Sequence, residues 1–146
     1  MRLELNARTP DVHADEAHLR QAVIAVLTNA QEALTDTSAI IIVRTGTRRL
    51  PRVSLDPPPV GVELSEGDFA FLEVEDPGAG MDENTQARMF DPFYSTKFLG
   101  RGLGLAAALG IVRIHGGAVD VRTRPDEGTR VTILLPIPHE TPTCPV

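Results

Sequence analysis

The chain has 146 residues, is 42% hydrophobic and 23% charged, and carries a net charge of −6, which is typical of a single soluble globular domain. The acidic balance argues against general nucleic-acid binding, because phosphate neutralisation needs clustered lysine and arginine. The single cysteine excludes a disulfide framework and a cysteine metal cluster. With no apolar run of membrane-spanning length and no signal-peptide pattern, these features predict a cytoplasmic domain without membrane contact of its own.

The first part of the chain predicts a strand followed by a long helix. Leu3, Leu5 and Ala7 alternate with polar residues, which indicates a strand with one buried face. Asp15 is the expected N-cap of a helix that runs to Leu34. The apolar residues of this helix recur at three- and four-residue steps and form one stripe: Leu19, Ala22, Val23, Val26, Ala30, Ala33 and Leu34.

The middle of the chain predicts two strands and a long connection. The run 39–43 is short, apolar and β-branched, and indicates a second strand. Residues 44–68 contain several prolines and glycines and are expected to form a long loop. The only candidate basic patch lies in this loop and is interpreted as solvated: Arg44, Arg48, Arg49 and Arg52. The run 69–75 alternates as a strand does and leads directly into Asp76.

The last part of the chain predicts two helices and a hairpin. Asp82 is expected to cap a short helix that ends near Met89. The run Leu103–His115 is rich in alanine, leucine and isoleucine and stops at two glycines, as a helix does. Two alternating runs joined by a turn predict a hairpin over residues 118–123 and 129–135.

The order of these elements predicts a two-layer α+β sandwich over residues 1–137. It suits a mixed, mostly antiparallel sheet of about five strands with helices on one face. A doubly wound α/β sheet is disfavoured, because hairpins outnumber the βαβ crossovers that it needs. The tail 138–146 is rich in proline and lies outside the predicted domain.

Two glycine turns stand out as candidate sites. The first, Asp76–Gly80, follows a strand, and the second, Gly100–Leu105, opens a helix. A carboxylate can accept hydrogen bonds from a base, and free backbone N–H groups at a helix start can hold phosphates. The P-loop spacing and the dinucleotide fingerprint are both absent, so the pattern indicates a nucleotide site of a different kind.

Four segments, taken in order, resemble the asparagine, first glycine, phenylalanine and second glycine boxes of one family: 19–33, Asp76–Met81, Met89–Lys97 and Gly100–Leu105. The chain thus resembles the ATP-binding catalytic domain of sensor histidine kinases. That domain belongs to the GHKL superfamily, which also holds gyrase, mismatch-repair and chaperone ATPases. The resemblance implies a Bergerat-type ATP-binding fold, in which residues 81–101 form the ATP lid.

The resemblance also implies roles at the metal and the base. Asn29 would present its side-chain oxygen to a Mg²⁺ ion that bridges the triphosphate, since Mg²⁺ prefers oxygen ligands. Asp76 would accept the adenine amino hydrogen, helped by Thr129 directly or through a water. Gly78 and Gly80 would let the backbone pass close to the base.

Further roles fall on the lid and on the second helix. Lys97 and Arg101 would lie over the phosphates and, with Asn29, make up the predicted catalytic set. Phe90 and Phe93 are expected to pack the lid onto a partner domain or the core. The remaining predicted contacts to the cofactor are Thr96, Gly100, Gly102, Leu103, Gly104 and Leu105.

Three observations depart from the family pattern. Ala25 stands four residues before Asn29, where hydrolysing relatives carry a water-activating glutamate, so we expect slow ATP hydrolysis. Glu32 stands where many relatives place a lysine or arginine, which puts a second phosphate contact from this helix in doubt. None of the four histidines fits a phosphoacceptor helix: His13, His18, His115 and His139.

The expected function is therefore that of the catalytic domain of a protein-histidine kinase in two-component signal transduction. It would use ATP and Mg²⁺ to phosphorylate a histidine on a separate dimerisation domain of the parent protein, which then serves a response-regulator receiver domain. Two alternatives stay open: a free-standing anti-sigma serine kinase of the same superfamily, and a nucleotide-binding scaffold that never transfers phosphate. The segment 90–93, Phe-Asp-Pro-Phe, favours the histidine kinase, whereas Ala25 and Glu32 keep the silent scaffold open.

Overall fold

The computed structural model describes residues 1–6, 12–34, 38–50, 60–61, 67–90 and 104–137. In chain order the elements are β1 Arg2–Glu4, α1 Glu16–Ala33, β2 Ile42–Leu50, β3 Val60–Gly61, β4 Gly67–Asp76, α2 Glu83–Arg88, α3 Gly104–Ile114, β5 Ala118–Arg124 and β6 Gly128–Pro136.

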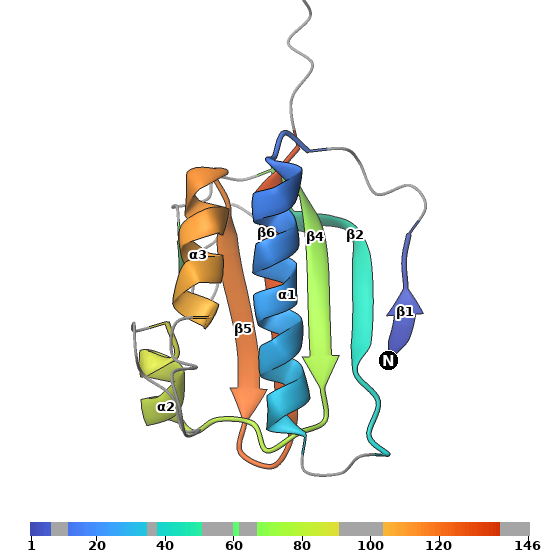
Figure 1. The fold of residues 1–146 in the computed structure, drawn as a ribbon, viewed down its shortest axis with the longest axis vertical. Coiled ribbons are helices and arrows are strands. Elements are labelled where there is room, and N and C mark those ends of the chain that lie inside the picture. Colours follow the sequence, from blue (N-terminus) through green and yellow to red (C-terminus); the bar gives the residue numbers. More distant parts are fainter. Residues whose placement is uncertain (7–11, 35–37, 51–59, 62–66, 91–103, 138–146) are drawn as a thin grey trace, which may run out of the picture.

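These strands form one sheet in the order β1-β2-β4-β6-β5-β3. β1 runs parallel to β2, and the other neighbouring strands are antiparallel. α1 and α3 lie side by side on one face of the sheet (Figure 1). The predicted two-layer sandwich is confirmed. The sheet has six strands rather than about five, because the two-residue β3 adds to β5.

The main core lies between the two long helices and the sheet. The apolar stripe predicted for α1 is buried there at Ala22, Val26 and Ala30, because residues at three- and four-residue steps share one helix face. The other fully or nearly fully buried members come from α3 and the central strands: Ala108, Val112, Val74, Val119, Val131 and Ile133. Burying each valine or isoleucine contributes about 1.5–3 kcal/mol to folding, so this layer anchors both helices on the sheet.

The helix starts follow their predicted caps. The Asp15 side chain accepts a hydrogen bond from the backbone N–H of His18 (3.0 Å), and α1 begins at the next residue. Asp82 accepts one from the N–H of Thr85 (2.8 Å) at the start of α2. These N–H groups lower the pKa of both aspartates, because they stabilise the charged carboxylate. The C-terminal end of α3 contacts the start of α1, because Nε2 of His115 accepts a hydrogen bond from the backbone N–H of Asp15 (3.0 Å).

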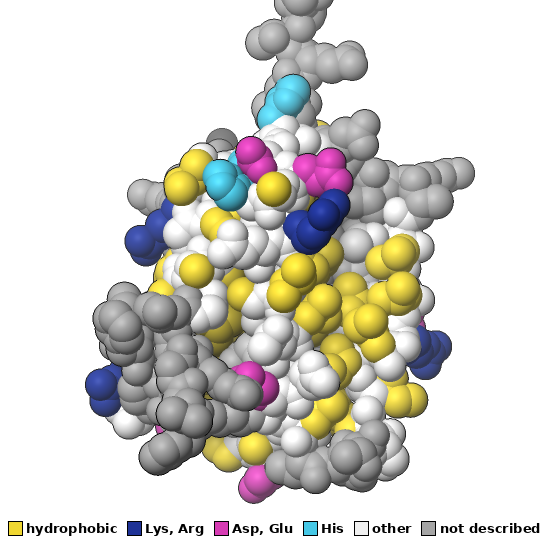
Figure 2. All heavy atoms as spheres, in the orientation of Figure 1, with side chains coloured by type: hydrophobic (Ala, Val, Ile, Leu, Met, Phe, Trp, Pro, Cys, Tyr) yellow, Lys and Arg dark blue, Asp and Glu magenta, His cyan; other side chains and the backbone are white. Residues whose placement is uncertain are grey.

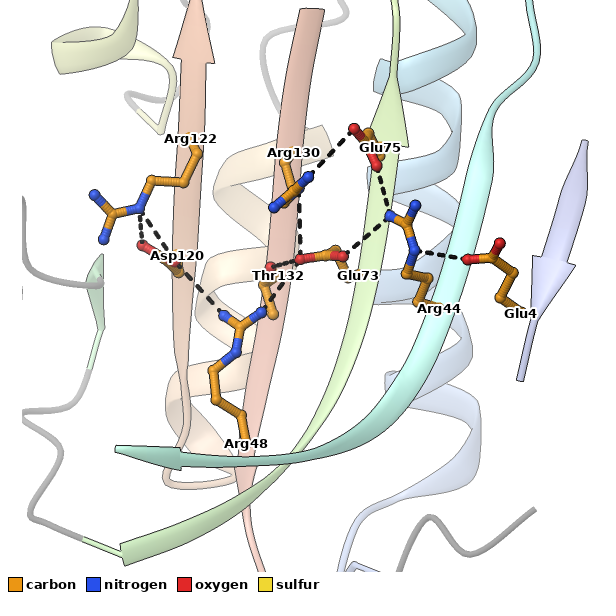
Figure 3. Close-up of polar contacts among 9 residues, drawn as sticks. All are labelled: Glu4, Arg44, Arg48, Glu73, Glu75, Asp120, Arg122, Arg130 and Thr132. Atoms are coloured by element: carbon orange, nitrogen blue, oxygen red, sulfur yellow. Dashed lines mark hydrogen bonds and ion pairs between the residues drawn. The ribbon is translucent and has the colours of Figure 1, made fainter. Parts of the chain in front are cut away.

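The predicted loop 44–68 is wrong at its start. β2 continues to Leu50 and pairs with β4 along its whole length, from Ile42 opposite Glu75 to Leu50 opposite Gly67. The second strand therefore begins and ends later than the predicted run 39–43. Arg44 and Arg48, which are expected to be solvated, are instead partnered on the helix-free face of the sheet, as Figure 3 shows. Arg49 pairs with Asp68 and is exposed, and Arg52 lies outside the described residues.

Two acidic residues of β4 hold that arginine cluster. Glu73 is 4% exposed and accepts hydrogen bonds from Arg44 (3.3 Å) and Arg48 (3.2 Å). Glu75 pairs with Arg44 and with Arg130. Hydrogen bonds from the Arg44 guanidinium hold the pKa of Glu75 below its ordinary value and raise the pKa of Arg44 itself. The charges predicted for a loop thus stabilise a strand pairing.

The first strand also differs from its prediction. β1 has three residues at the sheet edge, and Leu3 and Leu5 are 58% and 60% exposed, so the expected buried face is wrong. Figure 2 shows hydrophobic side chains gathered beside α1 on this side of the helix-bearing face. Figure 1 shows that neither of the long helices covers β1 or β2 there.

The other predicted elements agree with the structure to within about two residues. This holds for β4, α2, α3 and the C-terminal hairpin of β5 and β6. Most of the predicted lid and the tail 138–146 lie outside the described residues. None of the helices in the described ranges is long and apolar enough to cross a membrane.

Candidate functional site

Asp76 ends β4 and is nearly fully buried, with 3% of its surface exposed. Its Oδ1 accepts a hydrogen bond from the backbone N–H of Gly78 (2.9 Å), which shapes the turn that leaves the strand. Thr129 lies directly opposite on β6 and is also buried. The sheet register thus places the predicted base-binding pair side by side.

Thr129 belongs to a small hydrogen-bonded cluster. Its hydroxyl lies 2.9 Å from that of Thr123 on β5, which also bonds the carbonyl of Gly128 (3.1 Å) and the N–H of Met81 (2.9 Å). Thr123 is not among the site residues predicted from the sequence. The available signal was its place in the hairpin, because alternation along two strands joined by a five-residue turn puts it opposite Thr129.

The glycines of the first turn have protein neighbours that explain them. A Cβ at Gly78 would lie 2.4 Å from the carbonyl oxygen of Ala33 at the end of α1. Gly80 has φ +68°, and a Cβ there would lie 1.9 Å from the carbonyl oxygen of Arg124. The turn therefore packs closely against both α1 and the β5–β6 hairpin. The predicted approach of these glycines to a base stays a prediction.

Asn29 lies on the face of α1 that carries Ala25 and Ala33, because residues four apart are neighbours along a helix. At one end of this face a Cβ at Gly104 would lie 3.9 Å from the Cβ of Ala25, so the first residue of α3 contacts α1 there. At the other end Ala33 contacts the turn after Asp76, and its carbonyl accepts the N–H of Ala79 (3.3 Å).

Asn29 therefore lies between the start of α3 and the turn after Asp76, about 6 Å along the helix from either contact. Its side chain is half-buried and makes no hydrogen bond within the part of the chain that the structure describes. The packing of α1 thus brings together Asn29, the turn after Asp76 and Gly104, which are far apart in the sequence. None of the described residues hydrogen-bonds the side-chain oxygen of Asn29, so this oxygen can bind a ligand.

A hollow of about 490 Å³ opens at the ends of β4, β5 and β6. Asp76, Thr123 and Thr129 line it together with Gln86 of α2, whose Nε2 donates to the carbonyl of Val121 (3.3 Å). The lining continues onto the helix-free face of the sheet through charged residues: Glu75, Arg122, Arg124, Glu127 and Arg130. The hollow covers the base end of the predicted site and does not extend along α1 to Asn29.

The structure describes only part of the predicted lid. Phe90 follows α2 and packs against the main core, as one of its two predicted roles requires. Gly104 and Leu105 open α3. The other predicted lid and phosphate contacts lie outside the described residues: Phe93, Thr96, Lys97, Gly100, Arg101, Gly102 and Leu103.

The donor set suits a magnesium nucleotide rather than a metal held by protein alone. The described residues contain no group of three or more His, Cys, Asp or Glu that could hold a metal ion. Mg²⁺ takes oxygen ligands, keeps several waters and is commonly bound through few protein groups plus substrate phosphates. One amide oxygen beside a helix start fits that pattern, because the free N–H groups of the helix attract the same phosphates.

Comparisons with known proteins identify the family of this chain. A family model described as "Histidine kinase-, DNA gyrase B-, and HSP90-like ATPase" matches residues 14–139. The chain is 31% identical over 134 residues to the signal transduction histidine-protein kinase AtoS of Escherichia coli (strain K12), covering 92% of this chain and 19% of the relative. It is 33% identical over 139 residues to the C4-dicarboxylate transport sensor protein DctS of Rhodobacter capsulatus, covering 93% and 18%. The chain thus spans about a fifth of the length of these curated relatives.

Solved structures show the same fold. The mycobacterial sensor histidine kinase MprB superposes with a TM-score of 0.68 at 27% identity, covering 92% of this chain and 80% of that one. Full-length ShkA in complex with AMPPNP superposes with a TM-score of 0.69 at 24% identity, covering 92% of this chain and 25% of that one. The chain belongs to the histidine kinase-, DNA gyrase B- and HSP90-like ATPase family, and it matches the ATP-binding domain of sensor histidine kinases.

Proposed function

We propose that this chain is the ATP-binding catalytic domain of a sensor histidine kinase, which transfers the γ-phosphoryl group of ATP to a histidine on a separate dimerisation domain. The observation that carries the proposal is the position of Asn29 on α1. It lies between Gly104, which starts α3, and the turn that follows Asp76. A base at one end and phosphates at the other would span this face of the helix.

At the base end, Asp76 accepts the amino hydrogen of adenine, with Thr129 beside it. Both side chains are nearly fully buried, so a base that enters loses water and must find its hydrogen bonds in protein groups. Burial makes such bonds discriminating, because an unmatched polar group there costs about 1–3 kcal/mol. Because Gly78 and Gly80 lack a Cβ, the turn packs closely against α1 and the hairpin, and this packing holds Asp76 at its position.

At the phosphate end, the first N–H groups of α3 carry a partial positive charge and favour an anion. Asn29 would hold a Mg²⁺ ion with the nucleotide, and such an ion would neutralise part of the phosphate charge. Thr96, Lys97 and Arg101 add contacts from the lid, and the two cations stabilise the phosphoryl group during transfer. These lid roles rest on the sequence motifs alone.

The phosphate acceptor lies outside this chain. The curated relatives are about five times longer, and they are named as a histidine-protein kinase and a sensor protein. The partner is therefore a phosphoacceptor dimerisation domain of the parent protein, and through it the receiver domain of a response regulator. A two-component system places this domain in the cytoplasm, where ATP and the receiver domain are found.

Phosphotransfer to a matched fragment tests the proposal. The chain is mixed with γ-labelled ATP, Mg²⁺ and the dimerisation domain encoded in the same gene, and the labelled fragment is treated with acid and with alkali. The expected product is acid-labile, alkali-stable phosphate on the fragment, and Asn29→Ala should lower its rate by at least tenfold. Acid-stable label on serine would support the serine-kinase alternative, and nucleotide binding without any transfer would support a silent scaffold.

A further inference from the structure

Thr123 is the centre of a hydrogen-bonded cluster and has no role of its own in the predicted site. It lies on β5 opposite Thr129, at the strand ends that line the hollow beside Asp76. Its hydroxyl has three neighbours within hydrogen-bond distance: the N–H of Met81 (2.9 Å), the carbonyl of Gly128 (3.1 Å) and the hydroxyl of Thr129 (2.9 Å). The N–H can only donate a hydrogen bond, the carbonyl can only accept one, and the hydroxyl can do either.

Counting protons decides the direction of these bonds. A threonine hydroxyl has one proton to give and two lone pairs with which to accept. The Gly128 carbonyl can only accept, so it takes the proton of Thr123. The Met81 N–H can only donate, so it uses one lone pair of Thr123. The remaining lone pair faces Thr129, whose hydroxyl must therefore donate its own proton to Thr123.

This arrangement leaves Thr129 with lone pairs alone for a ligand. Thr129 is 5% exposed and Asp76 is 3% exposed, and the two residues are paired across β6 and β4. An ionised carboxylate also accepts only. A ligand that reaches this pair therefore meets two acceptors in neighbouring positions.

We propose that Thr123 is a positioning residue, which fixes Thr129 as a hydrogen-bond acceptor and so selects a 6-aminopurine over a 6-oxopurine base. The inference rests on the proposed function, because it needs a purine beside Asp76. The amino group at position 6 of adenine has two N–H bonds and can satisfy two acceptors. A 6-oxo group offers only lone pairs there and would face both acceptors without a proton.

Removing the Thr123 hydroxyl tests this reading. Thr123→Val keeps the side-chain shape but leaves the Thr129 hydroxyl free to turn, so that it can donate to a 6-oxo group. The measurement is the ratio of dissociation constants for non-hydrolysable analogues of inosine and adenosine triphosphate, with Mg²⁺, by calorimetric titration. These two nucleotides differ only at position 6 and its neighbouring ring nitrogen, so the ratio reports recognition of that edge.

We expect Thr123→Val to lower the ratio of the inosine to the adenosine constant by about tenfold. Thr123→Ser, which keeps the hydroxyl, should restore the wild-type ratio to within about twofold. Thr129→Val alone should lower the ratio as well, and adding Thr123→Val to it should change the ratio no further, because the first residue acts through the second. Thr47→Val on the exposed part of β2 is the matched control and should leave the ratio unchanged.

An unchanged ratio in Thr123→Val would overturn the inference, even if affinity for both nucleotides fell, since a purely structural role weakens both alike. A further drop when Thr123→Val is added to Thr129→Val would overturn it too. If Thr123→Val does not fold, Thr123→Ala provides the same comparison without the branched methyl groups. Failure of the proposed function has a different signature, because the wild-type chain would then bind neither analogue.

Discussion

Replacing Gly80 by alanine should both destabilise the fold and weaken the nucleotide site. Gly80 has φ +68°, where an alanine costs about 1–2 kcal/mol. The new Cβ would lie 1.9 Å from the Arg124 carbonyl oxygen, which is backbone and cannot turn away. The hairpin must then shift by about 1 Å, at a cost of about 1–3 kcal/mol. The sum is about 3 kcal/mol, which for a chain of this size lowers Tm by about 10 °C.

The same shift should reach the site, because the turn that contains Gly80 is bonded to the hairpin on both sides. The Asp126 N–H donates to the carbonyl of Ala79 (2.6 Å), and the Met81 N–H donates to Thr123. Affinity for a magnesium–ATP analogue should therefore fall by at least tenfold. Thermal unfolding followed by circular dichroism and calorimetric titration measure the two effects.

Gly110→Ala is the matched control for that substitution. Gly110 lies within α3, and a Cβ there would meet no heavy atom within 4 Å. Alanine is the better helix former by about 1 kcal/mol, so this variant should melt at or slightly above the wild-type temperature. A Gly80→Ala protein that melts within about 2 °C of wild type and binds normally would refute the packing argument for the first glycine turn.

Three further predictions concern the charged face and the chemistry. Glu73→Ala should lower the free energy of unfolding in urea by about 2 kcal/mol, because the buried Thr132 hydroxyl loses the carboxylate to which it donates, while the arginines keep other partners. A loss below about 0.5 kcal/mol would contradict this. The pKa of Glu75 is lowered by Arg44, so its contribution is present above about pH 4.5 and is lost as the pH falls through the folded pKa. The stability gap between wild type and Glu75→Gln should accordingly shrink from pH 7 to pH 3, and a gap that grows would refute the assignment. With Ala25 in place of a water-activating acid, the isolated chain should release phosphate from ATP no faster than a variant altered in the lid, and clear release above that control would count against the reading.

Local pattern was enough to predict the elements that build the site. The stripe of α1, the strand that ends at Asp76 and the hairpin after α3 all follow from periodicity and turn residues, and the structure agrees. Asn29 and Asp76 were identified by their motifs. That Asn29 lies near the turn after Asp76 could not be predicted from sequence spacing, because it depends on the contact of Ala33 with that turn at Gly78.

The failures of prediction share a physical cause, which is pairing between distant segments. β2 was predicted too short because Arg44 and Arg48 resemble loop residues until Glu73 and Glu75 are placed opposite them. β1 was given a buried face by alternation alone, although no long helix covers that edge of the sheet.

Thr123 was missed for the same reason. The hairpin register puts Thr123 opposite Thr129, but its bond to Met81 exists only once the turn after β4 closes on the hairpin.

Titration of a non-hydrolysable magnesium–ATP analogue into the wild-type chain and Asp76→Asn tests whether the adenine base lies at the end of β4. Asparagine keeps the size of the side chain and can still accept the N–H of Gly78, so the fold should survive, as unfolding by heat will verify. The amide group can no longer offer a carboxylate to the adenine amino group, and one charged hydrogen bond contributes about 1.5–3 kcal/mol. We expect a folded variant whose affinity is at least tenfold weaker than that of the wild-type chain. A folded variant that binds as tightly as wild type would show that the base does not lie at the end of β4.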